Sequence, residues 1–308
     1  MTEERQDTPA SPAPEGGTGA HDEPPRALPS PAGAWTRNFG IRAAAGVPVL
    51  LVLLLLIALA PLRVLSLLVA AAGVYGIYEF VRLVDGGLRI RLPLAPLLFA
   101  ATAIGLGGVI GSPTALGAGL LVGGGLLFWV HWFAAPSAGR EGPQELGVGL
   151  TGLLMVPWLL NHVGLVAQEP AGRGFLAFLL VAVSLSDTFA YLVGTLFGRW
   201  PLLPAVSPRK TVEGAVGGVA GGALGGVVAS LWMGGGPTPY GFLELILLGG
   251  LLAVAGQAGD LLESKLKRLN DADDSGNFLP GHGGLLDRVD AYLIAAPLSF
   301  YLLRWAAG

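Results

Sequence analysis

Long runs of apolar residues constrain this chain more than any other feature of its sequence. A helix needs about 20 mostly apolar residues to cross roughly 30 Å of hydrocarbon, and such runs recur along the sequence after residue 40. Only 13% of the 308 residues are charged, whereas a soluble domain carries roughly 25%. Open strands are excluded in lipid because their backbone groups would lack hydrogen-bond partners. The sequence therefore predicts an all-α, polytopic helical membrane protein.

Nine apolar segments are candidates for transmembrane helices. The first two are separated by little more than Pro61 and Arg63, so they are the pair most easily mistaken for one long helix. The predicted spans cover residues 43–60, 62–84, 92–111, 114–135, 146–168, 174–198, 212–233, 240–263 and 288–306.

The first 34 residues have a different composition. They are rich in Pro, Gly, Ala and acidic residues and contain almost no large apolar side chains. Such a segment cannot bury enough surface to offset the entropy lost on folding, so we expect residues 1–34 to be a disordered tail. Its acidic start, with no apolar run close behind, is not typical of a signal peptide.

Basic residues are distributed unevenly between the two sides of the predicted spans. With a cytoplasmic N-terminus, 15 of the 18 Lys and Arg residues lie on the cytoplasmic side. The other three are Arg63, Arg173 and Arg304. This bias is the positive-inside pattern, and it predicts a multi-pass inner-membrane protein whose N-terminus and polar loops face the cytoplasm.

Two interleaved glycine series mark the seventh predicted span. Glycines spaced by four lie along one helix face, where a neighbouring backbone can approach closely. A phosphate-binding loop is the alternative, but no Gly-Lys-Ser/Thr sequence follows, so we favour packing. The two series are Gly214, Gly218, Gly222 and Gly226, and Gly217, Gly221 and Gly225.

Carboxylates concentrate in residues 259–290, where seven acids accompany four Lys or Arg residues. Carboxylate oxygens are the ligands that Mg²⁺ prefers, usually together with substrate phosphates. Asp260 lies near the end of the eighth span, and Asp287 and Asp290 begin the ninth, so the turn between them would bring the two helix ends together. These three residues are candidate metal ligands. The alternative, a solvated loop with helix-capping aspartates, is favoured for the neighbouring Asp271 and Asp273.

A second polar segment, residues 186–213, interrupts the apolar pattern. Asp187 lies inside the sixth span, where an ionised group costs about 2.5–3.5 kcal/mol, so it is a functional candidate unless it is an interhelical hydrogen-bonding residue. Arg209 and Lys210 precede a predicted helix start at Thr211. Amides at a helix start bind anions, so these residues suit a polyphosphate; the alternative is a basic membrane anchor.

Two long gapped motifs in these segments make the sequence resemble a known family. The upstream motif comprises Asp187, Ala190-Tyr191 and the run Ser207–Gly214. The downstream motif comprises Ser264, Lys267-Arg268, Asp273-Asp274, Pro280-Gly281-His282-Gly283-Gly284 and Asp287-Arg288-x-Asp290. On these residues the chain resembles the phosphatidate cytidylyltransferases, also called CDP-diacylglycerol synthases, over roughly residues 175–306.

The resemblance implies transfer of CMP from CTP to phosphatidic acid in the lipid bilayer, with Mg²⁺ and a second, monovalent or divalent, cation. It implies no nucleic-acid partner, a homodimer, N-terminal transmembrane helices over residues 35–172 and a catalytic transmembrane region over residues 173–308. The implied catalytic residues are Asp260, Asp287, Lys210, Arg268 and His282. Nucleotide binding is implied for Ser207, Arg209, Lys210, Thr211, Lys267, Arg268, Gly283 and Gly284. Metal binding is implied for Asp260, Asp287, Asp274, Asp290 and Asp187.

One position departs from the family motif in charge. The motif has a lysine where this chain has Asp273, a reversal beside the predicted phosphate site. Repulsion between Asp273 and an anionic substrate predicts weak activity unless Lys265 or Lys267 replaces the missing cation.

Two other functions fit parts of the sequence. One is a CTP-using lipid-alcohol kinase, which only a substrate assay separates from a cytidylyltransferase. The other is an ion-coupled transporter that uses Asp187, but residues 40–170 contain no counterpart of the two motifs, as an internal repeat requires. Glu79 and Glu244 are single carboxylates in the second and eighth spans for which the pattern suggests no role.

Overall fold

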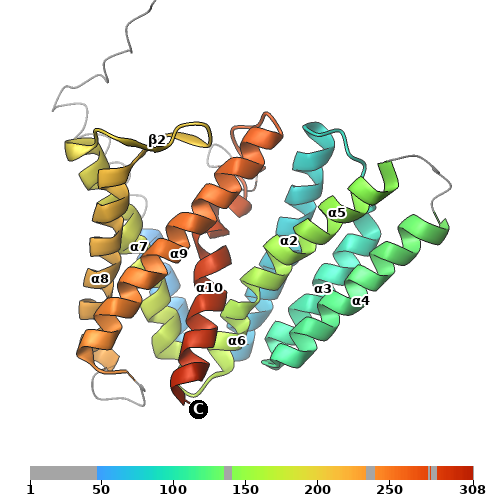
Figure 1. Ribbon diagram of the computed structural model, residues 1–308. Coiled ribbons are helices and arrows are strands. Elements are labelled where there is room, and N and C mark those ends of the chain that lie inside the picture. Colours follow the sequence, from blue (N-terminus) through green and yellow to red (C-terminus); the bar gives the residue numbers. More distant parts are fainter. Residues whose placement is uncertain (1–46, 135–140, 234–239, 277, 279–282, 308) are drawn as a thin grey trace, which may run out of the picture. The chain divides into compact units, whose positions relative to one another are not determined.

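The computed structural model describes residues 47–134, 141–233, 240–276, 278 and 283–307. Within these residues the chain consists of helices joined by short connections and one small hairpin (Figure 1). The predicted tail, residues 1–34, lies outside the described residues. The all-α membrane fold predicted from the sequence is confirmed.

The helices lie at positions along the chain close to those of the predicted spans. A helix over Val47–Leu59 comes first. The N-terminal helices are α2 (Leu62–Gly86), α3 (Leu94–Ile110), α4 (Pro113–Trp129) with the π-helix η1 (Val130–Ala134), α5 (Glu141–Leu153), the π-helix η2 (Leu154–Trp158) and α6 (His162–Gln168). The C-terminal helices are α7 (Gly172–Phe197), α8 (Val212–Met233), α9 (Phe242–Leu269) and α10 (Leu286–Ala307).

Six helical stretches of the described chain are long and apolar enough to cross a membrane. They correspond to α2, α4 with η1, α5 to α6, α7, α8 and α9. The helices Val47–Leu59 and Leu94–Ile110 are apolar but shorter. The count of nine spans therefore stays a prediction.

Proline, serine and glycine set several helix boundaries. Pro61 directly precedes α2, so the first two apolar segments form separate helices, as predicted. Gly111 ends α3 with a φ of 75°, a left-handed conformation that glycine adopts without strain. Ser112 then caps α4 by accepting a hydrogen bond from the amide of Ala115 at 3.2 Å.

The fifth predicted span is not one regular helix. Between α5 and α6 the chain passes through η2, which contains Pro157, and helix α6 begins anew after Asn161. A proline has no amide hydrogen to donate, which breaks the regular hydrogen-bond ladder and favours such a π-helical turn. Hydropathy alone could not distinguish this interrupted helix from a continuous one.

The glycines of α8 lie against two neighbouring helices, α7 and α9. A Cβ atom at Gly222 or Gly226 would lie 2.4 Å and 2.1 Å from the carbonyl oxygens of Gly249 and Leu245 in α9. A Cβ atom at Gly221 would lie 2.5 Å from the carbonyl oxygen of Leu185 in α7. The packing role predicted for these glycines is confirmed, because only glycine allows both neighbouring backbones to approach so closely.

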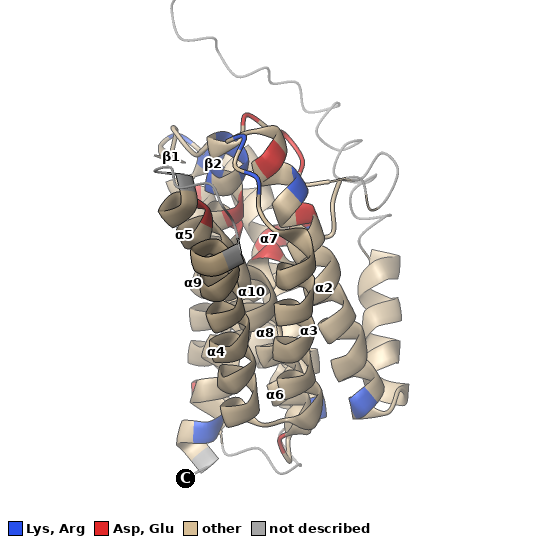
Figure 2. Ribbon diagram, turned by 90° about the vertical axis from the view of Figure 1, so that its right-hand side faces the viewer, with Lys and Arg blue, Asp and Glu red and all other residues tan. Residues whose placement is uncertain are grey.

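Charged residues gather mainly at the end of the helices that carries the hairpin, and fewer lie at the opposite end (Figure 2). The hairpin pairs β1 (Pro201–Leu203) with β2 (Ser207–Thr211) in antiparallel fashion. The sequence did not predict these strands, because the segment between α7 and α8 is short, proline-rich and without alternating polarity. Helix α9 also extends to Leu269 rather than residue 263, so its last turns lie at the charged end.

Candidate active site

The last turns of α9 lie against the beginning of α10. A Cβ atom at Gly259 would lie 2.3 Å from the carbonyl oxygen of Asp290, so α9 and α10 approach each other closely there. The predicted juxtaposition of these two helix ends is confirmed by the ion pair between Lys267 and Asp287, whose Nζ and Oδ1 atoms lie 2.6 Å apart.

Lys267 lies between two carboxylates. Its ammonium group is 2.6 Å from Asp287 and also 2.6 Å from Glu263, one helical turn earlier in α9. The Glu263 side chain is fully buried and the Lys267 side chain is only 16% exposed. Removing one partner of such a buried ion pair destabilises the protein, because the other partner is left as a buried charge without compensation. The sequence predicted Lys267 but not Glu263, which has the same i,i+4 spacing as many surface pairs.

Asp287 holds the turn that precedes α10. Its Oδ2 atom accepts hydrogen bonds from the Ser275 amide (2.9 Å), the Ser275 hydroxyl (2.8 Å) and the Gly284 amide (2.8 Å). Burial by itself would raise the pKa of this carboxyl, but the hydrogen bonds from Lys267 and Ser275 hold the pKa of Asp287 below its usual range. Both oxygens of Asp287 therefore already have donors, and its predicted metal role stays a prediction.

Lys210 joins the hairpin to α9. Its ammonium group forms an ion pair with the carboxylate of Asp260, which brings the two polar segments, residues 186–213 and 259–290, together. The charge of Asp260 also acts on Asp187 in α7 and on Asp290 in α10. Three carboxylates from three helices thus face one region, with Lys210 and Lys267 as the neighbouring cations.

The hairpin and the start of α8 are held by short side chains. Thr211 accepts a hydrogen bond from the Gly214 amide at 3.1 Å, which supports the predicted helix start. The Glu213 carboxylate accepts the amides of Arg199 and Trp200 at 3.1 and 3.2 Å, so it ties the end of α7 to the beginning of α8. Arg209 is exposed and Ser207 is half-buried on β2.

The outer part of the downstream motif is open to solvent. Arg268 and Asp273 form an ion pair at 3.4 Å, and their side chains are 47% and 96% exposed. Asp274 is also exposed. Gly283 has a φ of 78°. His282, predicted to be catalytic, lies outside the described residues.

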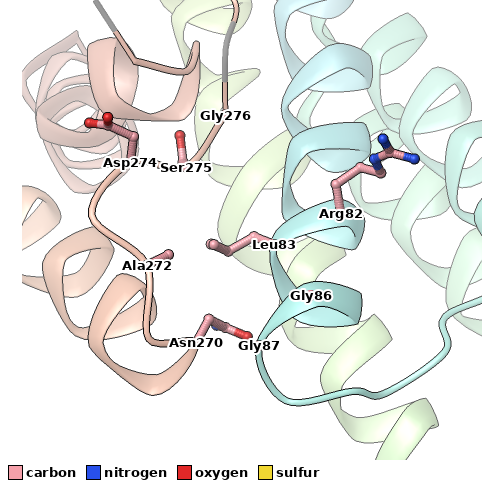
Figure 3. Close-up of a pocket in the computed structure, with 9 residues that line it drawn as sticks. All are labelled: Arg82, Leu83, Gly86, Gly87, Asn270, Ala272, Asp274, Ser275 and Gly276. Carbon is pink, nitrogen blue, oxygen red and sulfur yellow. The ribbon is translucent and has the colours of Figure 1, made fainter.

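A cavity of about 310 Å³ opens between the end of α2 and the loop after α9. Leu83 and Ala272 point toward each other across it, whereas the guanidinium of Arg82 points away (Figure 3). Asn270 connects its two walls by accepting a hydrogen bond from the Leu88 amide at 3.3 Å. The sequence contained no signal for this cavity, because its walls lie about 190 positions apart in the chain.

Glu79 and Glu244, which the sequence left without roles, both hold helix starts. Glu244 accepts the Gly241 amide at 2.7 Å and caps α9. Glu79, in α2, accepts the amides of Leu285 and Leu286 at 3.0 and 2.9 Å, so it belongs to the site. The only signal in the sequence was a carboxylate within an apolar helix, a position where an ionised group needs partners.

The site contains carboxylate oxygens, the kind of donor that a magnesium ion would need, and the magnesium site stays a prediction. Among the described residues no three acidic or histidine side chains are grouped as ligands of one metal. The ammonium groups of Lys210 and Lys267 lie on Asp260 and Asp287 instead. Carboxylate oxygens are nevertheless the hard ligands that Mg²⁺ prefers, and the mutual repulsion of Asp187, Asp260 and Asp290 is relieved by a divalent cation.

Comparison with known proteins agrees with the motifs. The profile of the cytidylyltransferase family matches residues 40–306. Phosphatidate cytidylyltransferase of Bacillus subtilis is 44% identical over 132 residues, which are 43% of this chain and 48% of that protein. Phosphatidate cytidylyltransferase of Staphylococcus saprophyticus is 39% identical over 144 residues, 47% of this chain and 54% of that protein.

A third relative matches over a longer range. Phosphatidate cytidylyltransferase of Mycobacterium bovis is 30% identical over 250 residues, 76% of this chain and 78% of that protein. The chain spans about half the length of the Bacillus and Staphylococcus relatives that it matches.

Proposed function

The chain belongs to the cytidylyltransferase family, and from that premise we propose that it is a phosphatidate cytidylyltransferase. It would transfer CMP from CTP to phosphatidate and form CDP-diacylglycerol and pyrophosphate. The observation that carries this proposal is the meeting of the two polar segments at one site, through the Lys210–Asp260 pair, beside the Lys267–Asp287 pair of the second segment. The names of the relatives in Bacillus, Staphylococcus and Mycobacterium support the choice of lipid substrate.

The reaction requires positioning and charge neutralisation rather than a covalent nucleophile on the protein. A phosphate oxygen of phosphatidate attacks the α-phosphorus of CTP, a new P–O bond forms, and the bond to the β-phosphate breaks to release pyrophosphate. Lys210, Lys267 and the exposed Arg209 and Arg268 would bind and orient the phosphates. A magnesium ion, when bound, neutralises phosphate charge. Asp260 and Asp287 would hold it, with support from Asp187, Asp274 and Asp290.

The carboxylates that pair with Lys210 and Lys267 would compete with substrate phosphates for these lysines. Each ammonium group now lies on a carboxylate, so an incoming phosphate competes with Asp260 for Lys210 and with Asp287 for Lys267. Nucleotide binding would then release carboxylate oxygens for a metal ion. Nucleotide and magnesium are therefore expected to bind cooperatively rather than independently.

We place the site at the cytoplasmic face. Nine spans with a cytoplasmic N-terminus put 15 of 18 Lys and Arg residues on that side. The gathering of charged residues at the hairpin end supports this orientation (Figure 2). A homodimer is part of the proposal and is tested by crosslinking in membranes.

The test is an assay of membrane fractions with phosphatidate, Mg²⁺ and CTP labelled at the α-phosphate. Label should appear in the lipid product, and chelation of Mg²⁺ should abolish it. CTP labelled at the γ-phosphate should leave the lipid unlabelled; a labelled lipid in that arm would identify a lipid kinase instead.

Two variants test the assigned residues. Asp260→Asn and Asp287→Asn should each lower turnover by about 100-fold or more, the scale seen when a group that stabilises transition-state charge is removed. Asp260→Asn is the sharper variant, because among the described contacts Asp260 pairs with Lys210 and holds no part of the turn. Glu169→Gln is the control, since Glu169 pairs with Arg304 at the opposite end. Retained turnover in Asp260→Asn, with normal insertion, would contradict the proposed metal role.

A further inference from the structure

Glu79 reaches the site from the N-terminal half of the chain. It lies within α2 and is only 3% exposed. Its Oε1 atom accepts the amide of Leu285 at 3.0 Å, and its Oε2 atom accepts the amide of Leu286 at 2.9 Å. Leu286 is the first residue of α10, where backbone amides have no partner within the helix. One carboxylate thus satisfies two adjacent amides at the start of the helix that carries Asp287 and Asp290.

Two glycines are packed directly on this carboxylate. A Cβ atom at Gly276 would lie 2.5 Å from Oε1 of Glu79, and one at Gly284 would lie 2.8 Å from Oε2. Any larger residue at either position would displace the carboxylate or the loop. Gly284 was predicted to admit a ligand; in the structure its lack of a side chain admits Glu79, Ser275 and Gly276.

Glu79 and Asp287 both hold the turn that precedes α10. The Gly284 amide donates to Asp287, and the next two amides, of Leu285 and Leu286, donate to Glu79. Within the described residues Glu79 forms no ion pair with Lys or Arg, so its negative charge is balanced by backbone amides and by the N-terminal end of α10. The orientation of Asp287 toward Lys267 therefore depends on a residue outside both motifs.

We infer that Glu79 is a positioning residue of the active site: it fixes the turn before α10, and this keeps Asp287 and Lys267 in the positions that bind substrate phosphates. The expected effect of Glu79 on turnover rests on the proposed function. Its role in holding the turn rests on the hydrogen bonds alone. It gives the N-terminal helices a direct part in a site whose recognisable motifs all lie after residue 186.

The test compares Glu79→Ala, Glu79→Gln and the matched control Glu244→Ala, all purified in detergent. Glu244 is a suitable control because it too accepts a backbone amide at a helix start, but at α9, away from the site. The first measurement is hydrogen–deuterium exchange of the peptide over residues 283–289. Glu79→Ala should speed exchange there about tenfold or more, since each amide loses a charged acceptor, whereas Glu244→Ala should not.

The second measurement is the dependence of initial rate on CTP concentration. Glu79→Ala should lower kcat/KM for CTP about tenfold or more and raise the KM for CTP several-fold. A smaller amount of folded enzyme lowers kcat but leaves KM unchanged, so the KM separates positioning from simple loss of structure. Glu79→Gln retains one acceptor oxygen and should fall between wild type and Glu79→Ala in both measurements, even if the alanine variant does not fold.

The outcomes separate the two proposals. If wild type makes no CDP-diacylglycerol, the proposed function fails, and exchange at Leu285 and Leu286 alone decides whether Glu79 holds the turn. If wild type is active but Glu79→Ala matches it in KM and kcat within twofold, the inference is overturned. Unchanged exchange in both Glu79 variants would overturn it as well.

Discussion

At the scale of single residues, the charge of Arg268 is shared with a solvent-exposed aspartate. Asp273 stands where the family motif has a lysine, and its carboxylate lies 3.4 Å from the guanidinium of Arg268. The Asp273 side chain is 96% exposed, so water screens most of this interaction, and exposed pairs contribute about 0–1 kcal/mol. Asp273 therefore weakens the positive charge of Arg268 only slightly, and it leaves the buried ion pairs of Lys267 unchanged.

We predict that Asp273→Lys lowers the KM for CTP by about two- to fivefold, because it restores a cation and releases Arg268 from its partner. Stability should change by less than about 0.5 kcal/mol, as is usual at an exposed position. Initial rates against CTP concentration and thermal unfolding in detergent are the measurements.

Asp85→Lys is the matched control, since it makes the same charge change at an exposed position at the end of α2. An equal effect in both variants would indicate a general effect of net charge. A raised KM in Asp273→Lys would mean that the aspartate contributes to binding.

At the scale of the elements, α8 packs closely against both α7 and α9. A Cβ atom at Gly222 would lie 2.4 Å from the carbonyl oxygen of Gly249, and a Cβ atom at Gly249 would lie 2.1 Å from the carbonyl oxygen of Gly222. These two backbones are therefore in direct contact, which gives van der Waals attraction where lipid provides no hydrophobic driving force between helices. This packing holds the hairpin, attached to the start of α8, over the end of α9.

Gly222→Ala should destabilise the protein by about 1–3 kcal/mol, because the added methyl group forces α8 and α9 apart. Gly125→Ala makes the same substitution on α4 at a site with no atom within 4 Å of the new Cβ, and it should be neutral. Thermal unfolding in detergent measures both. Equal midpoints for the two variants would contradict the packing role of Gly222.

At the scale of the whole molecule, the sparse basic residues opposite the hairpin also have local roles. Arg173, at the start of α7, donates hydrogen bonds to the carbonyl oxygens of Ala58 (2.6 Å), in the last turn of the first described helix, and of Ala60 (3.0 Å), just after that helix. Arg304 pairs with Glu169 at 3.7 Å. Arg63 is exposed and suits the membrane surface on that side.

The absence of cysteine from the sequence makes the topology directly measurable. A single cysteine at Pro204, in the hairpin, should react with a membrane-impermeant maleimide only after the cells are opened. A cysteine at Arg63 should react in intact cells, because the positive-inside pattern places it outside. The reverse labelling pattern would invert the proposed orientation, and labelling of both in intact cells would contradict the predicted number of spans.

The helical membrane fold, most helix positions and both motifs could be predicted from the amino-acid sequence. Lipid demands long apolar runs with every backbone group paired, so these features are written locally in composition. The glycine faces of α8 and the approach of Asp287 to the end of α9 could be predicted for the same reason, since helical spacing and a short connection decide them.

Contacts between residues far apart in the chain are visible only in the folded structure. Leu285 is 206 positions from Glu79 in the chain, and no local pattern specifies that contact. The pairing of Lys210 with Asp260 likewise depends on how the hairpin packs against α9, and the four hydrogen-bond donors to Asp287 are supplied by Lys267, Ser275 and Gly284. The long apolar runs predict where the helices lie, whereas the few polar side chains between them acquire partners only when those helices pack together.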